Sequence, residues 1–250
     1  MKEYIYKLFY HWRILLRDYS FRLSCLAGIF IFALGYSMNK FASISHDGVD
    51  YEPVGDLILN FLPTYNLEYV FVWGFYILIA LTVLYPLFFR PEIGPFLFKT
   101  FGILLFVRAG FIVLTHVGPP EGFFYGDGFE FFSNPISNVF FRNDLFFSGH
   151  VSVPFLAFLI LKDTKFKWLM LFGSILMAFT VLLMHIHYSI DVFSAFFITH
   201  GVYAISNKIF NDLNKRFKLR LKRYGWATFK KRLLKKKFLA EKFLKIRIKR

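Results

Sequence analysis

Six apolar stretches constrain the fold of this 250-residue chain more than any other feature. A helix rises about 1.5 Å per residue, so roughly 17–25 apolar residues are needed to cross the hydrocarbon layer of a bilayer, which is about 30 Å thick. The stretches are residues 23–38, 69–89, 96–115, 145–161, 168–184 and 190–205. They predict an all-α, polytopic membrane protein with six transmembrane helices. A segment over 1–22 precedes the six-helix membrane domain over 23–205, and a tail over 206–250 follows it.

Positive charge is concentrated in the tail. Of the 31 Lys and Arg residues, 18 lie in 206–250, where Asp212 and Glu241 are the acidic residues. The rest of the chain has 13 basic and 14 acidic residues. A basic tail beside a nearly neutral membrane domain is typical of proteins that contact anionic lipid headgroups, so we expect these headgroups as partners and no nucleic acid.

Charge also predicts the orientation in the membrane. The segment 1–22, the turn 162–167 and the tail are basic, and an even number of crossings places all three on one side. Because Lys and Arg are retained in the cytoplasm, this side is cytoplasmic and the acidic loops 39–67 and 116–144 face the periplasm, lumen or exterior. Since no folded domain precedes the first stretch, we expect a bacterial inner-membrane protein. The single cysteine, Cys25, excludes an intramolecular disulfide.

Two histidines and an aspartate are predicted to lie at the same depth in the membrane, near its outer face. His150 begins the fourth stretch at its outer end, and His187 and Asp191 lie where the fifth stretch ends and the sixth begins. A spacing of four residues brings His187 and Asp191 together on one helix face, where the carboxylate can fix the histidine tautomer. Such a set can supply a nucleophile and an acid/base group. The alternative is that these are hydrogen-bonded polar residues at a membrane interface. No spacing typical of a metal site occurs, and no cofactor is expected.

The motifs around these residues resemble those of the type 2 phosphatidic acid phosphatase (PAP2) superfamily, whose sphingomyelin synthase branch is the most similar. The branch pattern Asp-x-x-Phe-Ser-Gly-His is matched by Asp144 through His150, and His-x-His-Tyr-Thr-x-Asp-Val by His185 through Val192, with Ser189 replacing the threonine. Arg108, followed by Thr115 and Pro120, resembles a third patch of that branch. Asp56 is weakly similar to a further Pro-Asp motif. The resemblance implies a PAP2-like helical bundle.

The resemblance also implies roles for individual residues. His150, His187 and Asp191 would be catalytic. The expected substrate-binding residues are Arg108, His116, Asp144, Ser148, Gly149 and Tyr188. His116 is also explained as an ordinary interface histidine. The aromatic cluster over 123–132 either holds an ammonium group by cation–π contact or belongs to a membrane-interface belt.

Two departures from the family patterns bear on the substrate. Arg142 and Asn143 stand where the branch has Cys-Gly, which leaves the headgroup open, and Val181 stands where phosphatase relatives have an arginine. A phosphomonoester dianion needs several cations, whereas a headgroup phosphodiester is a monoanion. A single Arg108 therefore favours a phosphodiester.

The resemblance thus predicts a lipid phosphotransferase similar to sphingomyelin or ceramide phosphoethanolamine synthases. It would move a phospho-headgroup from a glycerophospholipid to ceramide or another lipid hydroxyl. His187 would attack phosphorus and form a phosphohistidine, Asp191 would orient His187, and His150 would transfer the proton. Direct attack by the acceptor, without a covalent intermediate, is the alternative that the sequence leaves open. The alternatives are a lipid phosphatase or phosphodiesterase that uses water as the acceptor, and a non-catalytic membrane scaffold.

Overall fold

The computed structural model describes residues 2–46, 51–123, 145–226, 228–231 and 234. This part of the chain is helical and contains no β-strand. The α-helices are α1 (Lys2–Leu16), α2 (Tyr19–His46), α3 (Phe75–Phe89), α4 (Gly94–Leu114), α6 (Gly149–Ile160), α7 (Lys167–Leu183) and α8 (Ser189–Tyr224). Short 3-10 turns cover Leu59–Phe61 and Pro91–Ile93, and a π-helical turn, Val70–Gly74, leads into α3.

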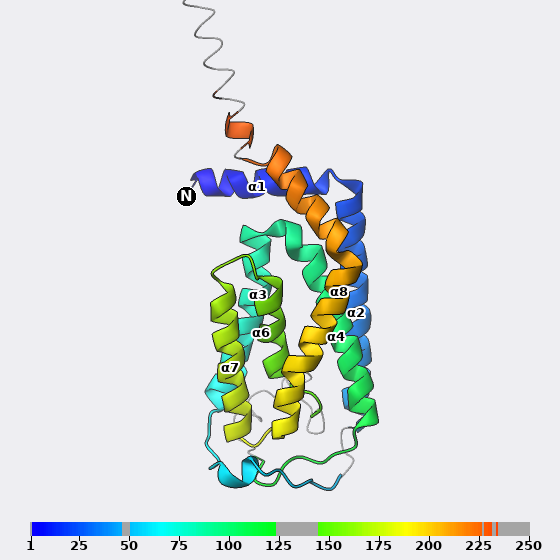
Figure 1. Ribbon diagram of the computed structural model, residues 1–250, viewed down its shortest axis with the longest axis vertical. Helices are drawn as coiled ribbons and strands as arrows, with labels where there is room; N and C mark the ends of the chain where they lie inside the picture. Colours follow the sequence, from blue (N-terminus) through cyan, green and yellow to red (C-terminus); the bar gives the residue numbers. More distant parts are fainter. Residues whose placement is uncertain (1, 47–50, 124–144, 227, 232–233, 235–250) are drawn as a thin grey trace, which may run out of the picture.

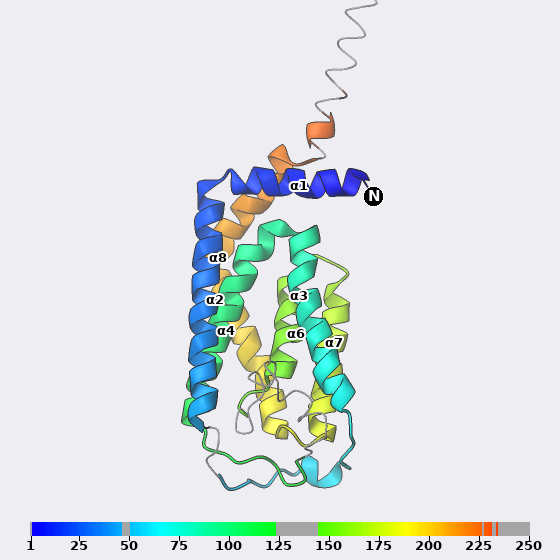
Figure 2. The same cartoon turned by 180° about the vertical axis from the view of Figure 1, so that it is seen from behind.

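Six of the helices run along one direction and form a bundle, while α1 lies across one end of it (Figures 1 and 2). The α1 end also contains the turns at 90–93 and 161–166 and the last turns of α8. The opposite end is called the histidine end. It contains the segments 51–69, 115–123, 145–149 and 184–188.

The core of the bundle consists largely of apolar side chains from α3, α4, α6, α7 and α8, among which Leu156, Met170 and Met177 are fully buried. Helix α2 packs on the outside of α4 (Figure 2). Their closest approach is at Gly35 and Gly102, where a Cβ atom on either residue would collide with the backbone of the other helix. Glycine at both positions therefore permits backbone-to-backbone packing of two long apolar helices.

Four helical segments are long and apolar enough to cross a membrane: Tyr19–Ser45, Val70–Phe89, Pro91–Leu114 and the helix that begins at Ser189. They correspond to the first, second, third and sixth predicted spans. Two further apolar helices, Gly149–Ile160 and Lys167–Leu183, are shorter. At about 1.5 Å per residue, the 12 residues of α6 extend only about 18 Å. Four candidate spans are thus confirmed, and the count of six stays a prediction.

The structure corrects two predicted boundaries. The fourth stretch was expected to be helical from residue 145, but α6 begins at Gly149 because the backbone of Phe147 and Ser148 is hydrogen-bonded to other elements. The sixth stretch was expected to end at residue 205, but α8 continues for 36 residues to Tyr224. The predicted border between the membrane domain and the tail therefore falls inside one continuous helix, whose last turns meet α1 (Figure 1).

Candidate active site

The start of α8 positions the second histidine and the aspartate. Asp191 lies in the first turn of α8, where its Oδ2 accepts a hydrogen bond of 2.9 Å from the backbone N–H of Tyr188. The same oxygen is 3.3 Å from Nδ1 of His187. A carboxylate only accepts hydrogen bonds, so the Nδ1 nitrogen carries the proton and Nε2 of the neutral ring keeps its lone pair. His187 and Asp191 are 3% and 2% exposed, so water competes little for this contact.

The segment before α6 is attached to the same turn of α8. The backbone N–H of Ser148 donates to the carbonyl oxygen of Asp191 at 3.3 Å, which brings the Ser-Gly-His motif beside the His187–Asp191 pair. The carbonyl of Ser148 in turn accepts hydrogen bonds from the backbone and hydroxyl of Ser152. The Ser148 hydroxyl is completely buried, and within the described residues it has no hydrogen-bond partner. It is therefore a donor available to a bound group.

His150 is held between two aromatic rings. Its imidazole lies 4.1 Å from the ring of Phe71, at an interplanar angle of 21°, and 4.0 Å from the ring of Phe75, at 35°. Phe71 belongs to the π-helical turn and Phe75 begins α3. A π-helical turn is commonly found at functional sites, where it changes the direction of side chains relative to an α-helix. Here the two rings fix the plane of the imidazole, which is 8% exposed.

Arg108 of α4 contacts the backbone of the segment that contains the Ser-Gly-His motif. Its Nε donates to the carbonyl of Phe147 at 2.8 Å, and its Nη1 donates to the side chain of Asn39 on α2 at 3.3 Å. The guanidinium packs over Gly149, where a Cβ would lie 3.6 Å from Nε. Gly149 adjoins His150, and the backbone hydrogen bond from Ser148 to Asp191 brings this segment beside the pair of His187 and Asp191. The positive charge of Arg108, which is only 7% exposed, is thus fixed beside the two histidines.

The structure brings six of the predicted site residues together and places the other three, Tyr188, His116 and Asp144, outside that group or outside the described residues. The six are Arg108, Ser148, Gly149, His150, His187 and Asp191, which the hydrogen bonds and packing above bring together. Tyr188 is buried, but its hydroxyl accepts from the N–H of Val54 and donates to the carbonyl of Gly118, so it joins two loops of the histidine end. His116 is exposed and its ring contacts Tyr51. Asp144, with most of the aromatic cluster, lies outside the described residues.

Two ionisable groups in the described loops of the histidine end have shifted pKa values. Burial raises the pKa of the Tyr188 hydroxyl, which therefore remains a neutral hydrogen-bond donor. Burial alone would also raise the pKa of Asp56, but hydrogen bonds from Ser189, Leu59 and Ile58 outweigh it and lower this pKa. The carboxylate of Asp56 accepts from both the N–H and the hydroxyl of Ser189, at 2.6 and 3.0 Å. Asp56 thus fixes the first residue of α8.

His185 connects two loops of the histidine end and does not belong to the group of predicted catalytic residues. Its Nδ1 is 3.0 Å from the carbonyl of Glu121, and its Nε2 is 3.2 Å from the carbonyl of Leu62. Its backbone has a positive φ of 51°, which is uncommon for a residue other than glycine. Across the described ranges, no group of three or more His, Cys, Asp or Glu side chains is arranged to hold a metal ion.

Phe71, Phe75 and Asn39 are contacts of the site that the sequence reasoning missed. Phe71 and Phe75 are two of 37 phenylalanines, and no residue pattern distinguishes them from membrane-facing ones. A π-helical turn also has no reliable sequence signature. Asn39 was detectable only as a polar residue at the end of the first apolar stretch.

Residues 143–208 match the family model described as PAP2 superfamily C-terminal. The match supports membership of the PAP2 superfamily. The matched segment contains His150, His187 and Asp191, whereas Arg108, Phe71 and Asp56 lie outside it. No curated protein and no solved structure matched the chain. The PAP2 match and the four apolar helices together support an integral membrane protein, and members of the PAP2 superfamily are typically phosphatases and phosphotransferases.

Proposed function

We propose that the protein is a membrane lipid phosphotransferase that moves a phospho-headgroup from a glycerophospholipid to the hydroxyl of a second lipid such as ceramide, as in the sphingomyelin synthase branch. The observation that carries the proposal is the contact of His187 with Asp191 beside His150 and Arg108, which is the one buried arginine among the described residues. The residues of the two histidine motifs favour the synthase branch. The presence of one arginine favours a phosphodiester monoanion over a phosphomonoester dianion as the substrate.

The first half-reaction uses the lone pair on Nε2 of His187. This nitrogen attacks the phosphorus of the donor, and the bond between phosphorus and the diacylglycerol oxygen breaks. Asp191 stabilises the imidazolium character that develops on His187 through Nδ1. His150, protonated at this stage, gives its proton to the departing diacylglycerol oxygen. Arg108 and the Ser148 hydroxyl stabilise the negative charge on the phosphate oxygens.

The second half-reaction restores both histidines. His150, now neutral, removes the proton from the acceptor hydroxyl, and the acceptor oxygen attacks the phosphohistidine. The bond between phosphorus and Nε2 breaks, which releases the new phospholipid and returns His187 to its starting state. In a hydrolase the acceptor would be water, and the same residues would release free phospho-headgroup.

We further propose that α6 and α7 complete a set of six spans, with the α1 end in the cytoplasm and the histidine end on the outer face. The basic residues near the α1 end and the acidic loops at the histidine end support this orientation. Glycerophospholipid phosphates lie at headgroup depth, which is where the histidine end would then meet the bilayer. Both lipids would therefore reach the site from within the membrane.

The test is the identity of the product. Purified protein in liposomes that contain ceramide and either phosphatidylcholine or phosphatidylethanolamine should form a phosphosphingolipid and an equal amount of diacylglycerol. Free phosphocholine, phosphoethanolamine or inorganic phosphate, in place of a phosphosphingolipid, would show a hydrolase. With donor labelled in phosphorus, acid-labile label should appear on the wild-type protein and on His200→Ala, whose altered histidine is exposed in the middle of α8, but not on His187→Ala. Absence of label from an active enzyme would contradict the phosphohistidine.

A further inference from the structure

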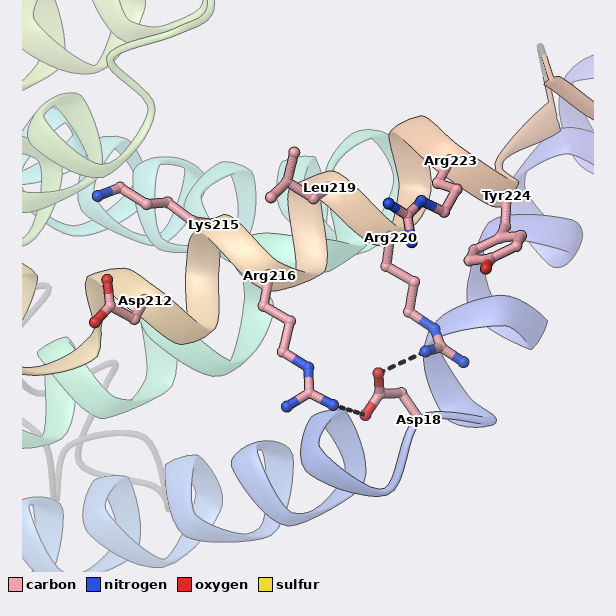
Figure 3. A pocket seen from close by; sticks show the side chains of 8 residues that line it. All are labelled: Asp18, Asp212, Lys215, Arg216, Leu219, Arg220, Arg223 and Tyr224. Carbon is pink, nitrogen blue, oxygen red and sulfur yellow. Dashed lines mark ion pairs between the residues drawn. The ribbon is translucent and has the colours of Figure 1, made fainter.

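The α1 end contains a groove, lined mainly by charged residues, that the proposed reaction does not use. It lies between the last turns of α8 and the junction of α1 with α2, and its volume is about 430 Å³ (Figure 3). It is lined by Asp18, Asp212, Lys215, Arg216, Leu219, Arg220, Arg223 and Tyr224, and is called the basic groove below. Four of these residues are cations and two are carboxylates, so the lining has a net positive charge.

Buried Asp18 fixes two of the arginines. It is 4% exposed, and its Oδ1 accepts a hydrogen bond of 2.9 Å from the N–H of Ser20 in the first turn of α2. Its carboxylate forms an ion pair of 2.8 Å with Arg220 and a longer one of 3.8 Å with Arg216, as Figure 3 shows. Arg220 also donates to the carbonyl of Ile14 on α1. The guanidinium groups are therefore held in place before any ligand arrives.

An apolar cluster supports the groove from behind. Leu15, Phe21 and Phe217 come from α1, α2 and α8, and each is 0% exposed. The rings of Phe21 and Phe217 are in edge contact at 5.1 Å. This cluster packs the three helices against one another, so the backbone positions that form the basic groove are fixed by the fold.

The cations of the basic groove outnumber its carboxylates. Asp18 is already shared by Arg216 and Arg220, and among the described residues Lys215 and Arg223 form no ion pair, although Asp212 also lines the groove. Arginine and lysine side chains at fixed positions around a cavity bind phosphate groups through charge-assisted hydrogen bonds. The groove is therefore complementary to an anion that carries a phosphate.

The position of α1 indicates where that phosphate comes from. Helix α1 lies across the bundle (Figure 1). Large apolar side chains are exposed along it: Tyr4, Ile5, Tyr6, Phe9 and Leu16. A helix with exposed apolar residues and interspersed basic ones lies in the plane of a membrane interface. The basic groove adjoins this helix, and its rim includes Leu219, 63% exposed, which can contact an acyl chain. A phospholipid headgroup reaches this position directly.

We propose that the basic groove binds the phosphate of an anionic phospholipid at the end of the bundle opposite the histidines. This site is separate from the donor and acceptor sites of the reaction, and it does not depend on the proposed function. Lys215 and Arg223 would supply the contacts that discriminate between an anionic and a zwitterionic lipid, while Asp18 would position Arg216 and Arg220.

The experiment measures lipid binding by the full chain. Short-chain phosphatidylglycerol, phosphatidylcholine and inorganic phosphate are each titrated into detergent-solubilised protein, and the bound species are counted by native mass spectrometry. Phosphatidylglycerol should bind at least about tenfold more tightly than phosphatidylcholine, since each cation near an anionic headgroup contributes roughly fivefold. Inorganic phosphate should compete poorly. Equal competition by phosphate would instead show a site for soluble anions and overturn the lipid assignment.

Two double variants with equal net charge distinguish lipid binding in the basic groove from non-specific attraction of anionic lipids to the basic protein surface. Lys215→Gln with Arg223→Gln removes two groove cations but leaves the Asp18 ion pairs intact, and it should abolish most of the preference for phosphatidylglycerol. Lys208→Gln with Lys222→Gln removes two exposed cations of α8 outside the groove and should retain the preference. An equal loss in both variants, or no loss in either, would contradict the proposal. Thermal unfolding of each variant checks that the fold is intact.

Discussion

The two ends of the bundle use charged side chains in different ways. At the histidine end, His187, Asp191 and Arg108 are between 2% and 7% exposed and are bonded to each other or to the backbone. At the α1 end, the side chains of Arg216 and Arg220 are 57% and 32% exposed, although both pair with a buried carboxylate.

This difference corresponds to two tasks. Charges that stabilise a reacting group are most effective when they are fixed and shielded from water, because the surrounding dielectric is then low and no reorganisation is needed. A site that exchanges lipids with a membrane needs only moderate affinity, and solvent weakens each of its ion pairs. Substitutions at the histidine end should therefore change rates by orders of magnitude, whereas those at the α1 end should change lipid dependence.

The largest effect is expected for the histidines themselves. His187→Ala removes the nucleophile and His150→Ala removes the proton-transfer group, so each should reduce kcat by about 10³-fold or more. Transferase assays in liposomes measure the rate, and His200→Ala provides the matched control. Residual activity within tenfold of wild type for either variant would contradict its proposed role.

The histidine end was partly predictable from sequence because its chemistry is local. The predicted contact between His187 and Asp191 is present, but the predicted reason was wrong: both were expected on one helix face, whereas His187 lies in the bend before α8 and only Asp191 is helical. The Ser-Gly-His motif identified His150. The order of α2, α4 and α7 and the limits of α4 and α7 also followed from apolar length, whereas α2 (Tyr19–His46) extends beyond the predicted stretch 23–38 at both ends. By contrast, the non-helical backbone at Phe147 is hydrogen-bonded to Arg108, which lies 39 residues earlier. The continuation of α8 past residue 205 depends on packing against α1, which the apolar pattern does not encode.

The next largest effect is expected for Arg108→Lys. Lysine keeps the charge but loses the planar group that donates to Phe147 and packs over Gly149. We expect kcat/KM to fall by about 10²-fold, similar to the loss of one donor in an oxyanion site.

Arg13→Lys, an exposed substitution on α1, serves as the control for Arg108→Lys and should leave kcat/KM unchanged. If Arg108→Lys were as active as Arg13→Lys, the role of the guanidinium in holding phosphate would be excluded. Both values come from initial rates measured over a range of donor mole fractions in the liposome.

A smaller effect is expected for Phe75→Leu. Leucine preserves apolar bulk but removes one of the two rings that fix the imidazole of His150. We expect kcat to fall by about tenfold with little change in KM, because the substitution disturbs the orientation of a catalytic group rather than a contact with lipid. Phe197→Leu, at a position on α8 that is 77% exposed, is the matched control. A change confined to KM would place Phe75 in lipid binding instead.

The smallest effect is expected for Asp56, which compares directly with Asp18 at the other end. Both carboxylates accept hydrogen bonds from the start of a helix, Asp18 at Ser20 of α2 and Asp56 at Ser189 of α8. Asp18 is also paired with arginines, whereas the donors to Asp56 are neutral. Asp56→Asn should therefore lower kcat only about threefold, since it loosens the turn that positions His187 without removing a reacting group.

The lowered pKa of Asp56 gives this prediction a direction in pH. Since the folded-state pKa lies below the unfolded value of about 3.9, the ionised carboxylate stabilises the fold above the unfolded pKa, and this contribution is lost as pH falls through the folded pKa. The wild-type protein should therefore have a higher Tm than Asp56→Asn at pH 6, and the difference should shrink as the pH falls from about 5 towards 3. Glu52→Gln, an exposed substitution in the same loop, should show no such convergence. A Tm difference that stays constant over this interval would mean that the hydrogen bonds from Ser189 do not require the negative charge of Asp56. The start of α8 would then be positioned without any contribution from that charge.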